Sequence, residues 1–144
     1  MSVPGRAAAS SPPAAAAAPA LAPKAGKVPK MPRLDLALHL IQKAQAMGLT
    51  VRENPYTDGV DPVHVRGSDH YRTLGKRKGK KVGAGMDVSG DPKAMRAFFD
   101  YAGKYAGRGV KDAFFDPAGF SFDNGKRWDR TIGGHSDHVH VSIG

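Results

Sequence analysis

Three histidines and an aspartate stand close together near the end of the chain, in the segment GGHSDHVHVSIG at residues 133–144. His135, His138 and His140 are three of the six histidines in the 144 residues, and Asp137 lies among them. Imidazole and carboxylate groups bind metal ions, and imidazole transfers protons near neutral pH. Because a fold rarely needs such a cluster for packing, the segment indicates a metal site or a proton-transfer site.

Two further groups in the sequence would complete a zinc site. The chain has no cysteine, so a metal site must use His, Asp or Glu. Asp87 lies in VGAGMDVSG (82–90), and His70 lies among the turn residues of GSDHYR (67–72). Hydrolytic zinc needs three protein ligands and one position for water, whose pKa it lowers toward neutrality. His70, Asp87 and His140 would supply these ligands, so that a hydroxide could attack a carbonyl group.

Alternating residues predict that two strands position these groups. In residues 82–90 the apolar side chains alternate with Gly, Gly, Asp and Ser, which is typical of a half-buried strand. The two glycines before Asp87 indicate close approach by another segment. The last strand alternates in the same way, with core-facing Val139, Val141 and Ile143 and outward-facing His138, His140 and Ser142.

The remaining pattern predicts an α+β fold with a small, mainly antiparallel sheet flanked by helices. Residues 34–48 read as a helix ended by Gly48, and Asp91-Pro92 opens a second helix with an apolar stripe. That stripe consists of Met95, Phe98, Phe99, Ala102 and Tyr105. The other expected elements are a strand at 49–53, a loop at 53–62, a strand at 62–65, a strand–turn–strand unit at 110–122 and a turn at 124–128.

The first thirty residues differ in composition from the rest. Residues 1–30 hold eleven Ala and six Pro and almost nothing large enough to bury, which predicts a disordered tail or linker. A signal peptide is the alternative, although the prolines interrupt its apolar segment. We therefore expect one folded domain at residues 31–144, with no segment long and apolar enough to span a bilayer.

The chain carries a net charge of +9, which favours a polyanionic environment. Five of the 22 Lys and Arg residues lie in KRKGKK at 76–81, which we expect to form a solvated basic loop. Nucleic acid, an acidic membrane surface and an anionic cell wall all fit this charge. The charge by itself does not choose among these partners.

Three short motifs resemble the zinc peptidases of the D-Ala-D-Ala carboxypeptidase/VanY type, which belong with the lysostaphin-type and hedgehog-type zinc folds. The motifs are Ser68-x-His70, Gly85-Met86-Asp87-Val88-Ser89-Gly90 and Gly134-His135-Ser136-Asp137-His138-Val139-His140-Val141. The resemblance covers roughly residues 50–144 and is closest to cell-wall-cleaving domains of bacteriophage endolysins and tail proteins.

The resemblance implies an antiparallel sheet with a zinc site on its face, held by His70, Asp87 and His140. It implies Asp137, three positions before the last His, as general base, and a peptidoglycan stem peptide as substrate. The implied protein is phage-encoded and acts at the host cell wall, either released from the host cytoplasm or carried on the virion. We further expect a monomer that uses the basic loop at 76–81 to contact anionic wall polymers.

Two departures from the family pattern leave alternatives open. Sixteen residues separate His70 from Asp87, a longer interval than in the family. An inserted loop preserves the site if its ends stay close, whereas His64 is the alternative ligand. Asp137 stands where many relatives have Glu.

The assignment of the general base is also open. Strict alternation puts Asp137 on the face opposite His140 unless the strand begins only at His138. The base is therefore either Asp137 or His138, and His138 could also stabilise a developing oxyanion. For the remaining candidates we expect structural or supporting roles: His135 beside the site, Ser68 bonded to the His70 loop, and Tyr71, Arg72 and Trp128 along a cleft or in ordinary packing.

Three other functional classes compete with a peptidase. A basic nucleic-acid-binding protein would explain the charge, but not an Asp and two His on polar faces. A metal-dependent nuclease would usually show more carboxylates. A non-catalytic zinc-binding relative that only binds the cell wall would not need Asp137. We expect a zinc-dependent peptidase whose partner is peptidoglycan, with no specific nucleic acid.

Overall fold

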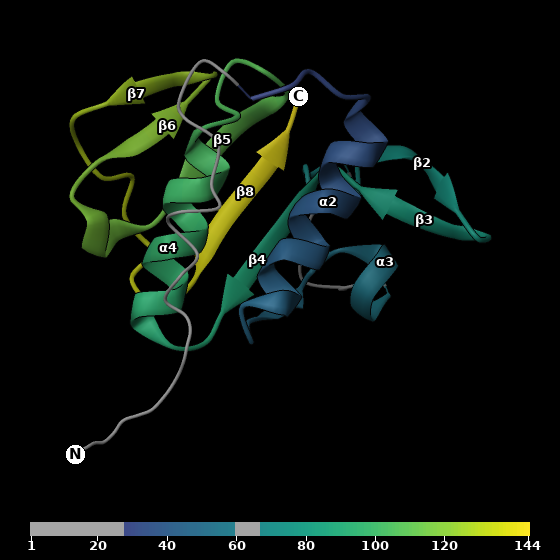
Figure 1. Ribbon diagram of the computed structural model, residues 1–144, viewed down its shortest axis with the longest axis horizontal. Helices are drawn as coiled ribbons and strands as arrows, with labels where there is room; N and C mark the ends of the chain where they lie inside the picture. The colour runs from purple at the N-terminus through teal and green to yellow at the C-terminus, as the bar shows by residue number, and fades with distance from the viewer. Residues whose placement is uncertain (1–27, 60–66) are drawn as a thin grey trace.

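The computed structural model describes residues 28–59 and 67–144. Six strands form one sheet in the order β1-β4-β8-β5-β6-β7, and β2 and β3 form a second, two-stranded sheet (Figure 1). The large sheet comprises β1 (Thr50–Arg52), β4 (Gly85–Ser89), β5 (Val110–Phe114), β6 (Ser121–Asp123), β7 (Lys126–Trp128) and β8 (Val139–Ile143). All its neighbouring strands are antiparallel. The predicted α+β class with a mainly antiparallel sheet is therefore confirmed.

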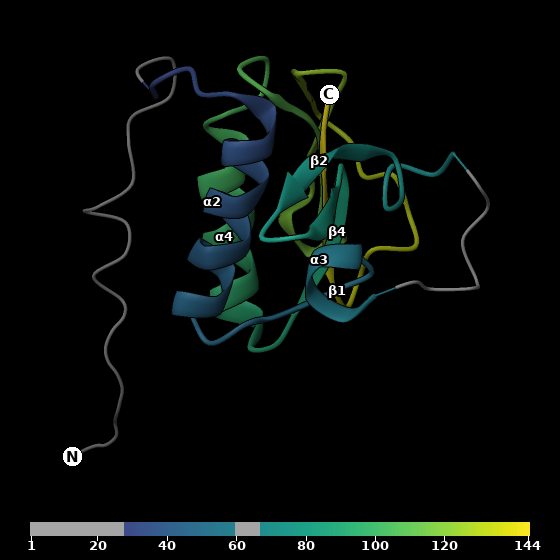
Figure 2. The same ribbon diagram turned by 90° about the vertical axis from the view of Figure 1, so that its right-hand side faces the viewer.

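Two helices, α2 (Arg33–Ala46) and α4 (Pro92–Gly103), lie side by side on one face of the large sheet (Figure 2). They enclose the core between themselves and the strands, and full burial of each large apolar side chain there contributes about 1.5–3 kcal/mol. The largest fully buried side chains in this core include Leu36, Leu40, Ile41, Met86, Phe98, Phe99, Tyr105 and Ile143. The opposite face of β4 and β8 remains for polar groups.

Both long helices begin or end at the residues that the sequence indicates. The Asp91 carboxylate accepts the N–H of Ala94 at 3.0 Å, and Pro92 occupies the first turn of α4. The five residues of the predicted stripe are all buried, although Tyr105 follows the end of α4 at Gly103 and only the other four lie on the helix. Helix α2 ends before Gly48, whose φ of 78° is the left-handed conformation that glycine adopts without strain.

The strand–turn–strand unit at 110–122 folds as predicted, whereas the turn predicted at 124–128 is shorter, because Lys126–Trp128 form β7 and pair with β6. A short 3-10 helix, η2 (Asp116–Ala118), and Gly119 with φ 84° turn β5 into β6. Asn124 and Gly125, with φ values of 52° and 80°, form the tip between β6 and β7. These turns keep β6 and β7 next to β5 at one side of the sheet (Figure 1).

The predicted solvated loop at 76–81 is wrong, because this segment is part of a β-hairpin. Strands β2 (Thr73–Arg77) and β3 (Lys80–Gly83) are antiparallel and join through Lys78 and Gly79, both with positive φ. The turn geometry suits a right-twisted hairpin, and the lysine side chains remain exposed on it. The hairpin projects from the side of the molecule beside α2 (Figure 1).

Two other predicted boundaries differ from the structure. The single strand expected at 82–90 is divided at Ala84, where the chain passes from the hairpin into the large sheet. The Ala84 N–H donates to the Arg72 carbonyl at 2.7 Å, and the Ala84 carbonyl accepts from the Ile143 N–H, also at 2.7 Å. The loop expected at 53–62 contains a one-turn helix, α3 (Pro55–Asp58), capped by Asn54. The strand expected at 62–65 lies outside the described residues.

The described fold begins slightly before the predicted domain boundary. Val28 is only 2% exposed and packs in the core, three residues ahead of residue 31. The prediction for residues 1–27 concerns a segment outside the described part of the chain. Among the helices that the structure describes, none is long and apolar enough to cross a membrane.

Candidate metal centre

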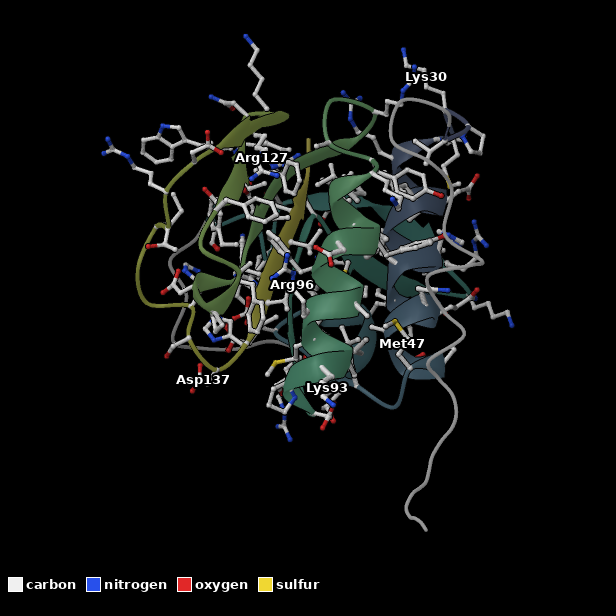
Figure 3. The ribbon with its side chains drawn as sticks, turned by 60° about the vertical axis from the view of Figure 1, so that its left-hand side comes forward. Lys30, Met47, Lys93, Arg96, Arg127 and Asp137 are labelled. Atoms are coloured by element: carbon white, nitrogen blue, oxygen red, sulfur yellow. The ribbon has the colours of Figure 1, made fainter. Side chains whose placement is uncertain are left out.

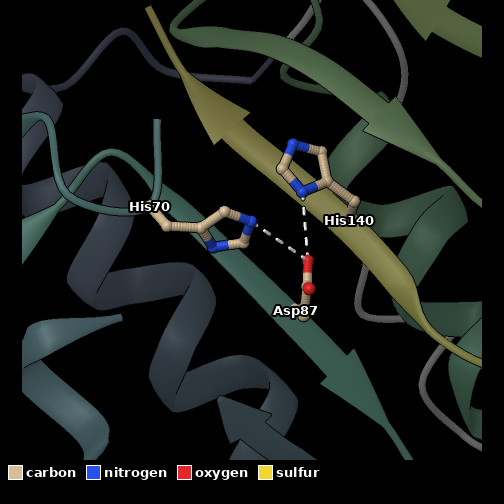
Figure 4. Close-up of side chains that lie close together, drawn as sticks. All are labelled: His70, Asp87 and His140. Atoms are coloured by element: carbon tan, nitrogen blue, oxygen red, sulfur yellow. Dashed lines mark hydrogen bonds and ion pairs between the residues drawn. The ribbon is translucent and has the colours of Figure 1, made fainter. Parts of the chain in front are cut away.

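The structure brings His70, Asp87 and His140 together, as predicted. Asp87 on β4 and His140 on β8 are direct partners in the strand register, so their side chains project from the same face. His70 comes from the turn before β2 and reaches the same point from the side (Figure 4). His70 is 5% exposed, and the other two side chains are partly buried.

The distances among these groups suit a metal ion. His140 Nδ1 lies 3.0 Å from Asp87 Oδ1, and His70 Nε2 lies 3.6 Å from the same oxygen. One candidate ligand atom from each of the three residues lies within 4.8 Å of the others. Two ligands of a tetrahedral zinc ion, each at 2.0–2.1 Å, stand roughly 3.3 Å apart. The donor set of two imidazoles and a carboxylate therefore fits zinc in both chemistry and spacing.

The imidazole of His70 is held in a defined tautomer. Its Nδ1 lies 2.7 Å from the backbone carbonyl of Glu53. Because a carbonyl oxygen only accepts hydrogen bonds, Nδ1 carries a proton, and Nε2 is the ring nitrogen that faces Asp87. Such a bond to the far ring nitrogen is how proteins orient metal-binding histidines.

The turn that carries His70 is fastened on several sides. The Ser68 hydroxyl accepts the N–H of His70 at 3.3 Å, which confirms the predicted role of Ser68. Asp69 accepts hydrogen bonds from Arg72 at 3.1 Å and from Lys111 on β5 at 3.2 Å. Arg72 also donates to the carbonyl of Ile143. Arg72 thus anchors this turn to the last strand.

The glycines beside Asp87 provide the space for this turn, as their positions in the sequence indicate. A Cβ added to Gly83 would meet the His70 carbonyl oxygen at 2.1 Å, and one on Gly85 would meet the His70 nitrogen at 2.8 Å. Both distances are shorter than the contacts that real Cβ atoms make, and the one at Gly83 is much shorter. The His70 backbone therefore rests directly on the backbone between β3 and β4.

Replacing Gly83 by alanine is expected to lower the free energy of unfolding by about 1–3 kcal/mol, because the added methyl overlaps backbone that has no room to shift. Denaturant unfolding measures this loss. Gly103→Ala is the matched control, since its Cβ would meet only the Phe122 ring edge at 2.4 Å, and that side chain can move. Equal free energies of unfolding for the two variants would contradict the close approach of the His70 backbone to Gly83.

Asp87 is ionised in this environment. Burial by itself would raise the pKa of Asp87, but the hydrogen bond from His140 and the fields of His70, His140 and His138 outweigh it and hold the pKa below its usual range. The carboxylate is thus in the state that a metal ion requires. The two oxygens of Asp87 face different histidines: Oδ1 faces His70 and His140, whereas Oδ2 lies 3.8 Å from His138 Nε2.

His138 and Asp137 form a pair at the entrance to β8. The strand begins at Val139, so neither residue is bound by the alternation of the strand. The Nδ1–H of His138 donates to Asp137 Oδ1 at 2.8 Å, which leaves Nε2 directed at Asp87. The Asp137 side chain is 89% exposed and points outward at the edge of the molecule (Figure 3). The hydrogen bond from His138 lowers the pKa of Asp137.

His135 packs beside the three candidate ligands without joining them. Its ring centroid lies 5.0 Å from that of His138 and 5.8 Å from that of His140. Its Nδ1–H donates to the Gly133 carbonyl at 2.7 Å, and its backbone exchanges bonds with Asp116. Burial is the main cause that lowers the pKa of His135. This arrangement fits the predicted supporting role.

Several residues at the site were not indicated by the sequence. Phe114 is the register partner of His140 on β5, and its ring stacks on the imidazole with centroids 5.6 Å apart. The Glu53 carbonyl and the Asn54 side chain behind it come from the segment predicted to be a plain loop. Only the Asn-Pro dipeptide, a turn signal, marks that place in the sequence.

Other predicted residues take different positions. Trp128 is exposed on β7 beneath the guanidinium of Arg130, at the far edge of the sheet from β4. The side chain of Tyr71 is partly buried next to His70. His64, the alternative ligand, lies outside the described residues.

Comparisons of the chain with models of known protein families, with curated proteins and with solved structures return no match.

Proposed function

We propose that the protein is a zinc-dependent peptidoglycan peptidase, of the kind found in phage lysins and phage tail proteins. The observation that carries this proposal is the convergence of His70, Asp87 and His140 on one point, with the His138 imidazole beside them. The same residues stand in motifs that resemble the VanY-type zinc peptidases. A structural zinc site would use four protein ligands, whereas the three that the described residues supply leave a position for water.

His70, Asp87 and His140 would hold the zinc ion. Bound zinc supplies Lewis-acid chemistry, which polarises a carbonyl group and makes water acidic enough to react near neutral pH. The ionised Asp87 balances part of the metal charge, and the Glu53 carbonyl keeps His70 in the tautomer that binds. Phe114 closes one side of His140 against solvent.

The His138–Asp137 pair would move the proton during hydrolysis of a stem-peptide amide. With Nδ1–H bonded to Asp137, His138 can accept a proton at Nε2 from the attacking water. It can then deliver that proton to the departing amine, which needs it to leave. Asp137 stabilises the imidazolium that forms in between, because its carboxylate is ionised and hydrogen-bonded to the ring. A zinc protein that only binds the wall would not need this pair.

Zinc analysis and a clearing assay test the proposal together. We expect about one zinc ion per chain after purification, and loss of turbidity when the protein is added to a peptidoglycan suspension. A chelator should stop the clearing, and added zinc should restore it, because the activity depends on the metal. Tight, salt-sensitive DNA binding by a zinc-free protein that clears nothing would contradict the proposal.

The basic hairpin β2–β3 supports an anionic partner, for which we propose wall polymers. Lys76, Lys78 and Lys81 are exposed on it, whereas Arg77 is paired with Asp35 at 2.8 Å. Lysines on a projecting, two-stranded element can reach a polymer without disturbing the core. A nucleic acid would meet the same charges, so it is the second candidate partner.

Changing Lys76, Lys78 and Lys81 together to glutamine is expected to weaken binding to purified cell walls severalfold at low salt, with zinc content unchanged. The difference should disappear at high salt, because screening removes the attraction of exposed charges. Pull-down with insoluble wall material measures it. The control changes Lys93, Lys104 and Lys126 to glutamine, which removes the same charge elsewhere; Lys93 stands at the start of α4 (Figure 3).

Equal losses in the two triple variants would show that net charge, and not the hairpin, attracts the wall. Duplex DNA binding is measured in parallel. A hairpin variant that loses DNA binding but keeps wall binding would favour the nucleic-acid partner.

A further inference from the structure

We propose that Asn54 is a positioning residue of the metal centre: its buried amide fixes both the ring and the backbone of His70. This inference rests on the proposed function, because it treats His70 as a ligand. Asn54 touches neither the metal point nor a substrate, so its effect passes through His70.

Asn54 is the polar centre of the contact between α3 and the strands. Its side chain is 0% exposed. The amide NH₂ donates to the carbonyls of Gly83 at 2.9 Å and Gly85 at 2.7 Å, and the amide oxygen accepts from the N–H of Gly83 at 3.2 Å and of Tyr56 at 3.1 Å. All the hydrogen-bonding capacity of this amide is therefore used inside the protein, where an unmade bond is costly.

The first route from Asn54 to His70 is through the preceding residue. The carbonyl of Glu53 accepts the Nδ1–H of His70, so the position of this carbonyl sets the orientation of the ring. Glu53 has a φ of 60°, a left-handed conformation that a non-glycine residue adopts only when its surroundings impose it. The anchored Asn54 side chain holds one end of this peptide.

The carboxylate of Asp58 holds the same turn from the solvent side. It accepts the N–H of Glu53 at 2.9 Å and the N–H of Asn54 at 3.2 Å. Asp58 is exposed, whereas Asn54 is buried. The turn is thus fixed by two independent side chains, one on each side.

The second route runs through the glycines. The Asn54 amide donates hydrogen bonds to the carbonyls of Gly83 and Gly85, which lie on either side of Ala84. The backbone of His70 rests on these same two glycines, with no room for a Cβ atom on either. Gly85 also begins β4, the strand that carries Asp87. The side-chain amide of Asn54 therefore fixes the position of the His70 backbone relative to Asp87.

An aspartate at position 54 separates the two halves of this contact. A carboxylate would still accept from Tyr56 and so would still cap α3. It could not donate to the carbonyls of Gly83 and Gly85, and its charge would repel them. Asn54→Asp therefore removes the two bonds that the Asn54 amide donates to the strands, while the oxygen that caps α3 and accepts from the Gly83 N–H remains.

The first test measures zinc affinity by competition with a chromophoric chelator. We expect Asn54→Asp to bind zinc about 10-fold to 100-fold more weakly than the unchanged protein, which is the usual loss when a group that orients a metal-binding histidine is removed. The control is Asp91→Ala, which removes a helix cap on α4 and lowers the melting temperature without touching this region. The control should keep the zinc affinity of the unchanged protein.

The second test reads the His70 ring in the metal-free protein. Nitrogen-15 NMR distinguishes the two neutral tautomers of histidine. We expect a single Nδ1–H tautomer for His70 in the unchanged protein and a mixture of tautomers in Asn54→Asp. Asp58→Ala, which loosens the same turn from the exposed side and should fold readily, is expected to show smaller changes in the same direction in both tests.

These measurements separate failure of the inference from failure of the proposed function. Zinc affinity within twofold of the unchanged protein in Asn54→Asp, or an equal loss in Asp91→Ala, overturns the role of Asn54 while the zinc site stands. If the unchanged protein binds no zinc but the His70 tautomer still responds to Asn54→Asp, the proposed function fails and the positioning of His70 by Asn54 stands. If Asn54→Asp does not fold, the same measurements are made on Asn54→Ser, which also lacks the amide NH₂ and can still cap α3; zinc affinity and a tautomer equal to those of the unchanged protein then overturn the inference.

Discussion

Replacing His140 by alanine is expected to remove zinc binding and wall-clearing activity together. His140 supplies one of the three donor groups and also bonds Asp87 at 3.0 Å. Zinc-finger sites with four protein ligands bind zinc with roughly 10–16 kcal/mol of free energy, or about 2.5–4 kcal/mol for each ligand. Loss of one ligand is therefore expected to weaken zinc binding by about 100-fold to 1000-fold. Metal analysis and chelator competition measure the affinity, and turbidity measures the activity.

The control for this variant is His39→Ala. His39 lies on α2, bonded to the Tyr101 hydroxyl at 2.6 Å on the helical side of the sheet. Its loss changes helix packing but no candidate ligand. A His140→Ala protein that still binds stoichiometric zinc as tightly as His39→Ala would show that the metal centre lies elsewhere.

Replacing His138 by alanine is expected to leave zinc bound and to lower kcat by about 10²-fold to 10⁴-fold, the usual contribution of a general acid–base group. Zinc should stay bound because His138 lies beside the three candidate ligands and is not one of them. The kcat should fall because the His138 Nε2 faces the site at Asp87, while its Nδ1 is hydrogen-bonded to the Asp137 carboxylate. Zinc content and the rate of release of new amino groups from cell walls measure the two effects separately.

A double-mutant cycle decides between His138 and Asp137 as general base. If Asp137 acts through His138, Asp137→Ala lowers kcat in the unchanged protein but has almost no further effect in the His138→Ala background. If Asp137 takes the proton itself, its removal lowers kcat by a similar factor in both backgrounds. The geometry favours the first result, although the family resemblance alone implies Asp137 as the base.

The part of the site that lies on strands could be predicted from the sequence. Alternation with a period of two fixes which side chains share a face, so His140 could be assigned to the polar face of the last strand. The same rule applied to Asp87. In the observed register these two residues are direct partners; the shared apolar faces of β4 and β8 exclude a shift by one residue but do not by themselves choose this register.

The choice between Asp137 and His138 could not be predicted in the same way. It depends on where β8 begins, and strand ends are the least certain part of any pattern. The strand begins at Val139, so Asp137 is released from the alternation and turns outward. Only the hydrogen bond between the two side chains shows how they act together.

The basic hairpin and the Asn54 contact could not be read from local patterns either. A run of lysines resembles a solvated loop, because the pairing of β2 with β3 comes from the backbone and from the Lys78–Gly79 turn. The bonds of Asn54 to Gly83 and Gly85 join residues about thirty positions apart. A single sequence carries no direct signal for such long-range contacts, although the glycines did indicate that something approaches them.

Mass analysis of the muropeptides released from purified cell walls tests most directly whether the protein is a zinc-dependent stem-peptide peptidase. We expect the zinc-loaded protein to cut an amide bond in the stem peptide or its cross-link and to leave the glycan strands intact. Each cut adds one water, and the identity of the new ends shows which bond is hydrolysed. No cuts should occur after chelation or with His140→Ala. Stem peptides that remain intact, or cuts that persist without zinc, would show that the protein is not a zinc-dependent stem-peptide peptidase.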